Sequence, residues 1–244
     1  MVGVSEQAFL VDSRWIERSL ELAGPAREDV VFLLGGGNGQ VASALGEGVS
    51  RVVTVEPDQA IANYLYSLEL YRNLVVQAPP HLVLGDMGFD KLLCLQPSMV
   101  DESVLEGMLS VPFSRAVLMM SDDVAGAFRR RDMLGTLLRA AFDHEVVRSV
   151  PKNAFSPALP FPASLVVVSP ASDSDPVKRS LRLLLSEAGT MRGLLTRSCR
   201  EFFGYTLAEA QEAVKLLDKD LLRKRFSEVS EEEFQQVYEW LKLG

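Results

Sequence analysis

The sequence predicts an α/β fold, with a mostly parallel β-sheet that has an antiparallel edge, followed by a small all-helical domain. Short apolar runs alternate with helical periodicity through the first 170 residues, which is the pattern of repeated βαβ units. After a linker at residues 169–176, which is rich in Ser, Asp and Pro, every apolar pattern has helical spacing. We therefore expect one domain over residues 1–170 and a helical domain over residues 171–244.

The composition fits a globular protein and restricts its partners. The 244 residues carry a net charge of −8, whereas a dedicated nucleic-acid binder is usually basic. No apolar run approaches the ~18 residues that span a bilayer. Cys94 and Cys199 lie in unrelated patterns, so we expect a reducing, cytoplasmic setting. We expect no membrane partner, no DNA partner and no bound metal.

The first elements have clear sequence signals. Asp12 or Ser13 can cap a helix that contains Trp15 and ends at Gly24-Pro25. A buried strand over residues 30–34 then stops in glycines, and a helical pattern follows. A second strand over residues 51–55 ends in Glu56. These signals predict the first βαβ unit.

The rest of the sheet and the helical domain are expected from similar patterns. The last two strands should pair through the proline-rich loop 151–162 as an antiparallel edge. Capping boxes at Thr206 and Ser230 each predict the start of a C-terminal helix. The remaining strands are expected at residues 81–85, 91–95, 115–120, 144–150 and 164–169.

The glycine loop is the first candidate for a binding site. Parallel α/β sheets bind ligands outside the carboxyl ends of their strands. Gly35, Gly37 and Gly39 follow one strand, Glu56 follows the next, and Asp86 ends the expected third strand. Glycines allow close approach of a ligand, and an acid about 20 residues further on can bind ribose hydroxyls. A tight turn without a ligand is the alternative interpretation.

Two nucleotide cofactors fit this pattern. Residues 37–42 match a dinucleotide phosphate pattern with Ala at its third position. S-adenosylmethionine fits better, because it has no pyrophosphate and needs a ribose acid and an adenine acid one strand further on. In this interpretation Glu56 contacts the ribose, Asp86 contacts the adenine, and Leu10 in the opening motif completes the cofactor site.

The order of these motifs resembles the ribosomal RNA adenine N6-dimethyltransferase family of the KsgA type, nearly from end to end. The resemblance implies a Rossmann-like, S-adenosylmethionine-dependent methyltransferase domain and a small helical domain that helps to hold ribosomal RNA. The matching segments are Gln7–Asp12, Gly35–Gly39, Glu56, Gly85-Asp86, Ala116–Met119, Asn153–Pro157, Ser164–Val167 and Lys224–Ser230.

The chain departs from that family where catalysis takes place. The family has an Asn-Leu/Pro-Pro-Tyr motif after the fourth strand, in which Asn binds the target amino group and Tyr stacks on the base. Here the stretch is Leu95, Gln96, Pro97 and Ser98. An alternative match near Ser110 and Phe113 keeps a proline and a ring. Ala8 and Leu33 replace two further polar residues of the family pattern.

The expected partners follow from the resemblance and from local charge. Two basic clusters are RNA-binding candidates, although each could be a solvated helix face. We expect a catalytically weak or inactive relative that keeps a cofactor-shaped pocket and binds ribosomal RNA, the small ribosomal subunit or a protein. An active RNA adenine methyltransferase and a protein-binding module with an empty pocket are the alternatives. The candidate arginines are Arg129, Arg130, Arg131, Arg192, Arg197 and Arg200.

Overall fold

The structure is a computed structural model that describes residues 7–85 and 87–243. It divides into two compact units. Among the described residues, the first unit holds those up to 126 and residues 143–170, and the second holds residues 127–142 and 171–243. The expected helical domain lies in the second unit, which also takes up residues 127–142.

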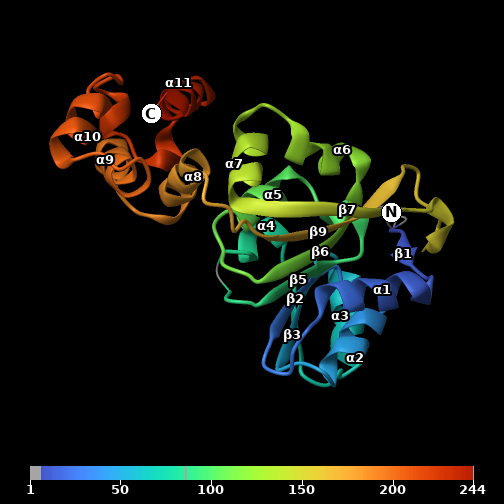
Figure 1. Ribbon diagram of the computed structural model, residues 1–244. Coiled ribbons are helices and arrows are strands. Elements are labelled where there is room, and N and C mark those ends of the chain that lie inside the picture. Colours follow the sequence, from blue (N-terminus) through green and yellow to red (C-terminus); the bar gives the residue numbers. More distant parts are fainter. Residues whose placement is uncertain (1–6, 86, 244) are drawn as a thin grey trace. The chain divides into compact units, whose positions relative to one another are not determined.

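A seven-stranded sheet forms the centre of the first unit (Figure 1). The strands β2, β3, β4, β5 and β6 run parallel to their neighbours, and β9 runs antiparallel to β6. The expected α/β class with an antiparallel edge is confirmed. From one edge to the other the strands are β4 (Asn73–Val76), β3 (Arg51–Val55), β2 (Val30–Leu34), β5 (Lys91–Cys94), β6 (Arg115–Ser121), β9 (Ala163–Pro170) and β7 (Phe142–Val150).

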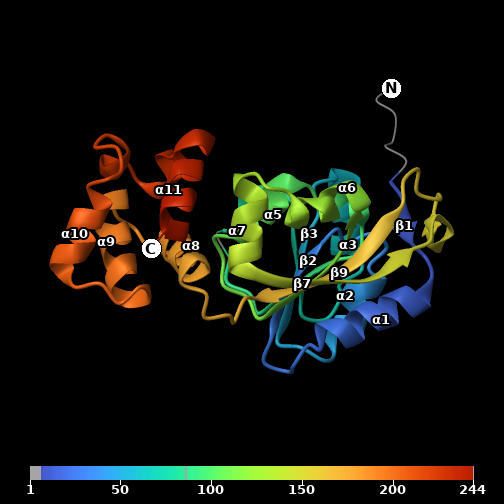
Figure 2. The same ribbon diagram turned by 45° about the horizontal axis from the view of Figure 1, so that its top comes forward.

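The central strands are apolar because helices cover both faces of the sheet. All four residues from Val31 to Leu34 are fully buried. Helices α1 (Ser13–Ala23) and α2 (Gln40–Gly46) lie on one face, and α5 (Glu102–Met108) lies on the other (Figure 2). Helix α1 begins and ends as expected, since Asp12 accepts a hydrogen bond from the Arg14 N–H and Gly24 adopts a left-handed φ of 52°.

The expected strand at residues 81–85 is wrong. Residues Pro80–Val83 form the short helix α4, and the third strand of the sheet is β4. Proline at the first helical position has a φ that suits a helix and lacks an N–H that would stay unpaired there. Strand β4 follows α3 (Gln59–Ser67) and was missed because it is only four residues long and lies at the sheet edge, where Leu74 is exposed.

A second, two-stranded sheet joins the opening motif to the proline-rich loop. β1 (Phe9–Leu10) pairs antiparallel with β8 (Phe155–Ser156). The Val11 N–H also donates to the Ala154 carbonyl at 2.9 Å. Two segments that resemble the same family are therefore adjacent in space, although about 145 residues separate them in the sequence.

Helices dominate the second unit, and the short α6 (Asp122–Ala125) precedes it. Thr206 and Glu209 form the expected capping box, and Ser230 and Glu233 exchange the equivalent hydrogen bonds. Over the described residues, no helix is long and apolar enough to cross a membrane. The helices of this unit are α7 (Met133–Ala141), α8 (Pro176–Ser186), α9 (Met191–Phe202), α10 (Leu207–Val214) and α11 (Glu231–Leu243).

Candidate functional site

The glycine loop joins β2 to α2 at the carboxyl edge of the sheet. Gly35, Gly37 and Gly39 have φ values of 79°, 52° and 83°, in the left-handed region that side chains other than glycine rarely adopt. Gly39 is also the N-cap of α2. The loop therefore needs glycine at these three positions for its backbone shape alone.

Glu56 holds this loop in place from the end of β3. One carboxylate oxygen accepts the Gly36 N–H and the other accepts the Asp58 N–H, each at 3.1 Å. The side chain is fully buried. Burial raises the pKa of Glu56, while the hydrogen bonds from the Asp58 and Gly36 N–H groups oppose that rise. Both oxygens of the residue expected to bind a ribose already accept backbone hydrogen bonds.

Side chains of the protein pack closely over the glycines. A Cβ at Gly35 would lie 2.6 Å from the Gln96 Oε1, and a Cβ at Gly37 would lie 3.3 Å from the Phe9 ring. A Cβ at Gly36 would lie 2.2 Å from a methyl group of Leu65. The space that the glycines leave beside the loop is therefore filled by side chains of the protein itself. Sequence reasoning missed this, since it requires knowing that β1 and β5 lie beside the loop.

A cleft of about 530 Å³ opens next to the loop. It brings together Asp58, Ser98 and Phe161, with the buried Glu56 beneath them. These groups can accept hydrogen bonds and can contact a flat apolar group. The cleft is lined by Gln7, Ala8, Glu56, Pro57, Asp58, Ser98, Met99, Leu159, Pro160 and Phe161.

Of the four residues after β5 that correspond to the family's catalytic motif, Ser98 lines this cleft. Leu95 is 5% exposed and belongs to a hydrophobic cluster with Leu10, Leu33 and Leu93. Gln96 is buried, and its Nε2 has no hydrogen-bond partner among the described residues. Pro97 opens a short 3-10 turn that places Ser98 at the cleft.

The alternative motif lies at the opposite edge of the sheet. Asp90 precedes β5, accepts the Val30 N–H at 2.8 Å, and its carbonyl accepts the Ser114 N–H at 2.8 Å. Ser110 and Phe113 thus lie near the amino ends of the strands, away from the glycine loop. The Phe113 ring is buried and stacks against Phe89, with centroids 6.3 Å apart. This corrects the expectation that the two residues could replace the family motif at the cofactor site.

Two expected cofactor contacts have no counterpart in the cleft. Leu10 packs in the hydrophobic cluster from β1 and does not line the cleft. Asp86 lies outside the described residues. The segment before it is α4 and not a strand, and β4 is followed by Gln77-Ala78-Pro79-Pro80. No acid therefore directly follows the strand next to β3.

The six candidate arginines all lie in the second unit. Arg130 pairs with Asp132 at 2.8 Å, and Arg197 pairs with Glu201 at 2.7 Å and Glu187 at 3.2 Å. The first cluster lies in the turn before α7, and the second lies on α9. The exposed members are Arg129, Arg131, Arg192, Arg197 and Arg200.

Cys94, at the end of β5, should be chemically inert in the folded protein. Its thiol is fully buried and donates to the Gln96 carbonyl at 3.3 Å, and burial raises the pKa of Cys94 to about 12. Only the thiolate is a nucleophile. We expect no reaction of Cys94 with a thiol reagent at pH 8.5 until urea unfolds the chain. Modification of Cys94 at the denatured rate under native conditions would contradict this burial.

The sheet order and the glycine loop at its carboxyl edge define the class of fold as a Rossmann-like methyltransferase fold. Two solved structures share it over nearly the whole chain. A dimethyladenosine transferase from Plasmodium falciparum has a TM-score of 0.62 at 15% identity, covering 96% of both chains. The 23S rRNA methyltransferase ErmE has a TM-score of 0.59 at 17% identity, covering 96% of this chain and 99% of its own.

The similarity to known sequences extends over the same length. A probable ribosomal RNA small subunit methyltransferase A from Methanosarcina barkeri is 24% identical over 96% of this chain and 86% of its own. The protein of the same description from Pyrococcus abyssi is also 24% identical, over 97% of this chain and 90% of its own. No family model matches the chain. The expected resemblance is confirmed, and the chain is similar over nearly its whole length to probable ribosomal RNA small subunit methyltransferases A.

Proposed function

We propose that this protein is a cytoplasmic RNA-binding relative of the ribosomal RNA adenine dimethyltransferases that does not transfer methyl groups efficiently. Its partner in this proposal is the ribosomal RNA of the small subunit, which the names of the curated relatives specify for those proteins. S-adenosylmethionine binds weakly or not at all.

The observation that supports the proposal most strongly is the leucine at position 95, where the family pattern has an asparagine. An adenine amino group must lose a proton and accept a methyl group, and a positioned acceptor beside it stabilises the charge that develops. Leu95 has no acceptor and is packed in the hydrophobic cluster. Ser98 reaches the cleft but offers no ring on which an extruded base could stack. Loss of one positioned polar contact in a transition state costs roughly 10²-fold or more in rate.

The residues around the loop also fit S-adenosylmethionine poorly. Each oxygen of Glu56 already accepts one backbone N–H, so a ribose hydroxyl would have to share this carboxylate with the backbone. The adenine needs an acid after β4, where the chain has Gln77-Ala78-Pro79. The Gln96 amide and the Phe9 ring lie close to Gly35 and Gly37. Each lost hydrogen bond to a charged group weakens binding by about tenfold or more.

Titration calorimetry and RNA binding test this proposal together. We expect S-adenosylmethionine to bind at least ~10-fold more weakly than to an active dimethyladenosine transferase, because the carboxylate contact to the adenine is missing after β4. We also expect small-subunit ribosomal RNA to bind in a salt-dependent manner. Tight cofactor binding would contradict the cofactor part of the proposal. An absence of RNA binding would contradict its RNA part and would favour a protein partner.

A matched variant separates the two basic clusters of the second unit. Replacing Arg129 and Arg131 by Gln should weaken ribosomal RNA binding and lower its salt dependence, because each guanidinium that contacts a phosphate releases counterions. Replacing Arg192 and Arg200 by Gln is the control, since these exposed arginines belong to the second cluster and the control removes the same number of charges. Equal losses in the double variant and the control would show that only net charge matters.

A further inference from the structure

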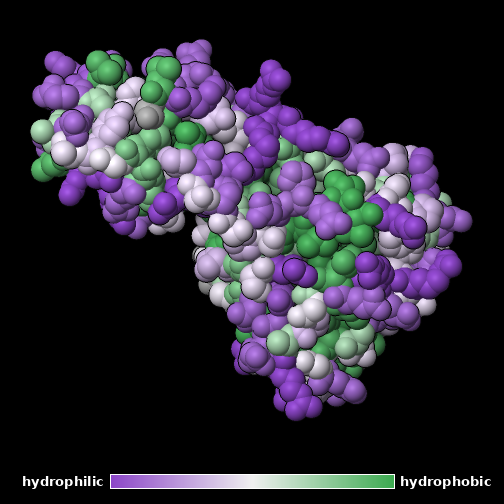
Figure 3. All heavy atoms as spheres, in the orientation of Figure 1, coloured by the Kyte–Doolittle hydropathy of each residue, from purple (hydrophilic) through white to green (hydrophobic). Residues whose placement is uncertain are grey.

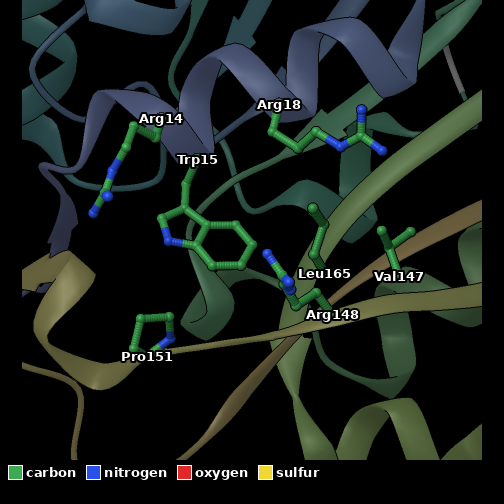
Figure 4. A pocket seen from close by; sticks show the side chains of 7 residues that line it. All are labelled: Arg14, Trp15, Arg18, Val147, Arg148, Pro151 and Leu165. Atoms are coloured by element: carbon green, nitrogen blue, oxygen red, sulfur yellow. The ribbon is translucent and has the colours of Figure 1, made fainter.

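A second hollow, unrelated to the cleft, lies between α1 and the strands β7 and β9. Its volume is about 660 Å³. It shares no lining residue with the cleft beside the glycine loop, and all its residues belong to the first unit. The lining residues are Arg14, Trp15, Arg18, Val147, Arg148, Pro151 and Leu165 (Figure 4).

Trp15 supplies an aromatic surface to this hollow. It is half-buried and packs against the main hydrophobic cluster, so the ring is held in place before any ligand binds. Figure 4 shows the indole projecting from α1 toward Pro151 and Arg148 on the opposite wall. In Figure 3, hydrophobic surface over β7 and β9 is bordered by hydrophilic side chains. A fixed, partly accessible indole suits stacking with a flat ring.

Three arginines surround the indole. Arg14 and Arg18 are one helical turn apart and leave α1 on either side of Trp15, while Arg148 comes from β7 (Figure 4). Arg14 donates to both oxygens of Asp12, at 3.0 and 2.7 Å, and Arg18 donates to Glu21 at 3.1 Å. Exposed ion pairs of this kind contribute little to stability, so a phosphate can compete for these guanidinium groups.

Arg148 differs from the other two arginines of the hollow because it has no acidic partner among the described residues. It is exposed on β7. The first 170 residues contain 20 acidic and 13 basic residues. The three arginines around Trp15 therefore form a locally basic site in a part of the chain that is acidic as a whole. The local charge favours an anionic ligand, and the indole favours one that carries aromatic rings.

We propose that this hollow binds single-stranded RNA, with one base stacked on Trp15 and the neighbouring phosphates paired with Arg14, Arg18 and Arg148. An acidic peptide would use the arginines but would leave the indole without a role. The proposal goes beyond the proposed function, because neither the glycine loop nor the second unit takes part. It gives the first unit an RNA contact of its own.

Tryptophan fluorescence tests this site directly. The chain has two tryptophans, so the full-length Trp240→Phe variant reports on Trp15 alone. Titration with a ten-nucleotide oligouridylate should quench this fluorescence, because a base stacks on the indole. Arg148→Gln in this background should weaken binding about tenfold and make the salt dependence less steep, since one phosphate contact is lost. Arg27→Gln, an exposed arginine just after α1, should change neither quantity.

Two more variants keep the test clear of folding defects. Trp15→Phe retains a ring and should bind within a few-fold of the parent, whereas Trp15→Leu retains apolar bulk and should lose about tenfold. Binding of these two is measured by fluorescence anisotropy of a labelled oligonucleotide, and their folding is checked by circular dichroism. Equal affinity of both variants, equal effects of Arg148→Gln and Arg27→Gln, or no quenching would overturn the proposal.

Competition experiments distinguish the possible ligands and the two proposals. If polyglutamate displaces the oligonucleotide at equal concentration of charges, the site recognises acidic chains and the RNA assignment fails. Calorimetry with S-adenosylmethionine and binding of whole ribosomal RNA are measured on the Arg148→Gln variant. We expect cofactor binding to be unchanged, so a failure of this proposal is distinguishable from a failure of the proposed function.

Discussion

Replacing Glu56 by Ala should lower the free energy of unfolding by about 2 to 4 kcal/mol. The Gly36 and Asp58 N–H groups both lose their acceptor in a fully buried place, and an unsatisfied buried donor costs about 1 to 3 kcal/mol. Removing a desolvated carboxylate offsets part of this loss. Urea unfolding followed by circular dichroism measures the difference. Glu47→Ala, at an exposed acid in the neighbouring loop, is the control.

The effect of Glu56 should also depend on pH with a definite sign. Burial raises the pKa of Glu56 above its ordinary value of 4.5, so the folded state binds the proton more tightly than the unfolded state does. The contribution of this group to stability is therefore full below pH 4.5 and falls as the pH rises through the raised pKa. The stability difference between wild type and Glu56→Gln should be larger at pH 4.5 than at pH 7. A difference that grows toward neutral pH would contradict the burial of this carboxyl group.

Gly36→Ala should destabilise the protein by about 1 to 3 kcal/mol in the absence of any ligand, the usual cost of overpacking a core. The added Cβ would lie 2.2 Å from the Leu65 Cδ1 and 2.7 Å from the Thr54 Cγ2. Both residues are buried and cannot move away freely. Thermal unfolding measures the effect, with Gly88→Ala as the control, because a Cβ there meets no atom within 4 Å. Equal melting temperatures for the two variants would mean that the loop is not closely packed.

Several strands of the sheet could be predicted from the sequence because each carries an unambiguous signal. Strand β2 is a continuous apolar run that ends in glycines, and β7 and β9 are separated by a proline-rich loop. Strand β4 lacked such a signal, since its four residues include the exposed Leu74. The apolar residues near Leu82 have a pattern that predicts a strand, although Pro80 starts a helix there.

The candidate site could be predicted only in part. The glycine loop and Glu56 were identified from local spacing, and the proposed loss of the catalytic motif comes from comparison with a family pattern. The packing of Phe9 and Gln96 over the glycines depends on strand pairings between distant segments. The hollow around Trp15 likewise joins α1 to strands more than 120 residues further along the chain. No local pattern contains such information.

The same geometry gives the glycine loop a structural role in addition to the cofactor role that the sequence predicts. Its positive φ angles, its bonds to Glu56 and its contacts with Leu65 all stabilise the fold without a cofactor. Methyl transfer would need an acceptor in place of Leu95 and a ring in place of Ser98. We therefore propose that the fold of a methyltransferase is kept here while its reaction is not.

A methyl-transfer assay tests this claim most directly. Purified protein is incubated with labelled S-adenosylmethionine and small ribosomal subunits that lack adenine dimethylation, with an active dimethyladenosine transferase as the positive control. We expect no label in the RNA above the level without protein. Efficient formation of dimethyladenosine, reduced when Ser98 is replaced by Ala, would contradict the claim.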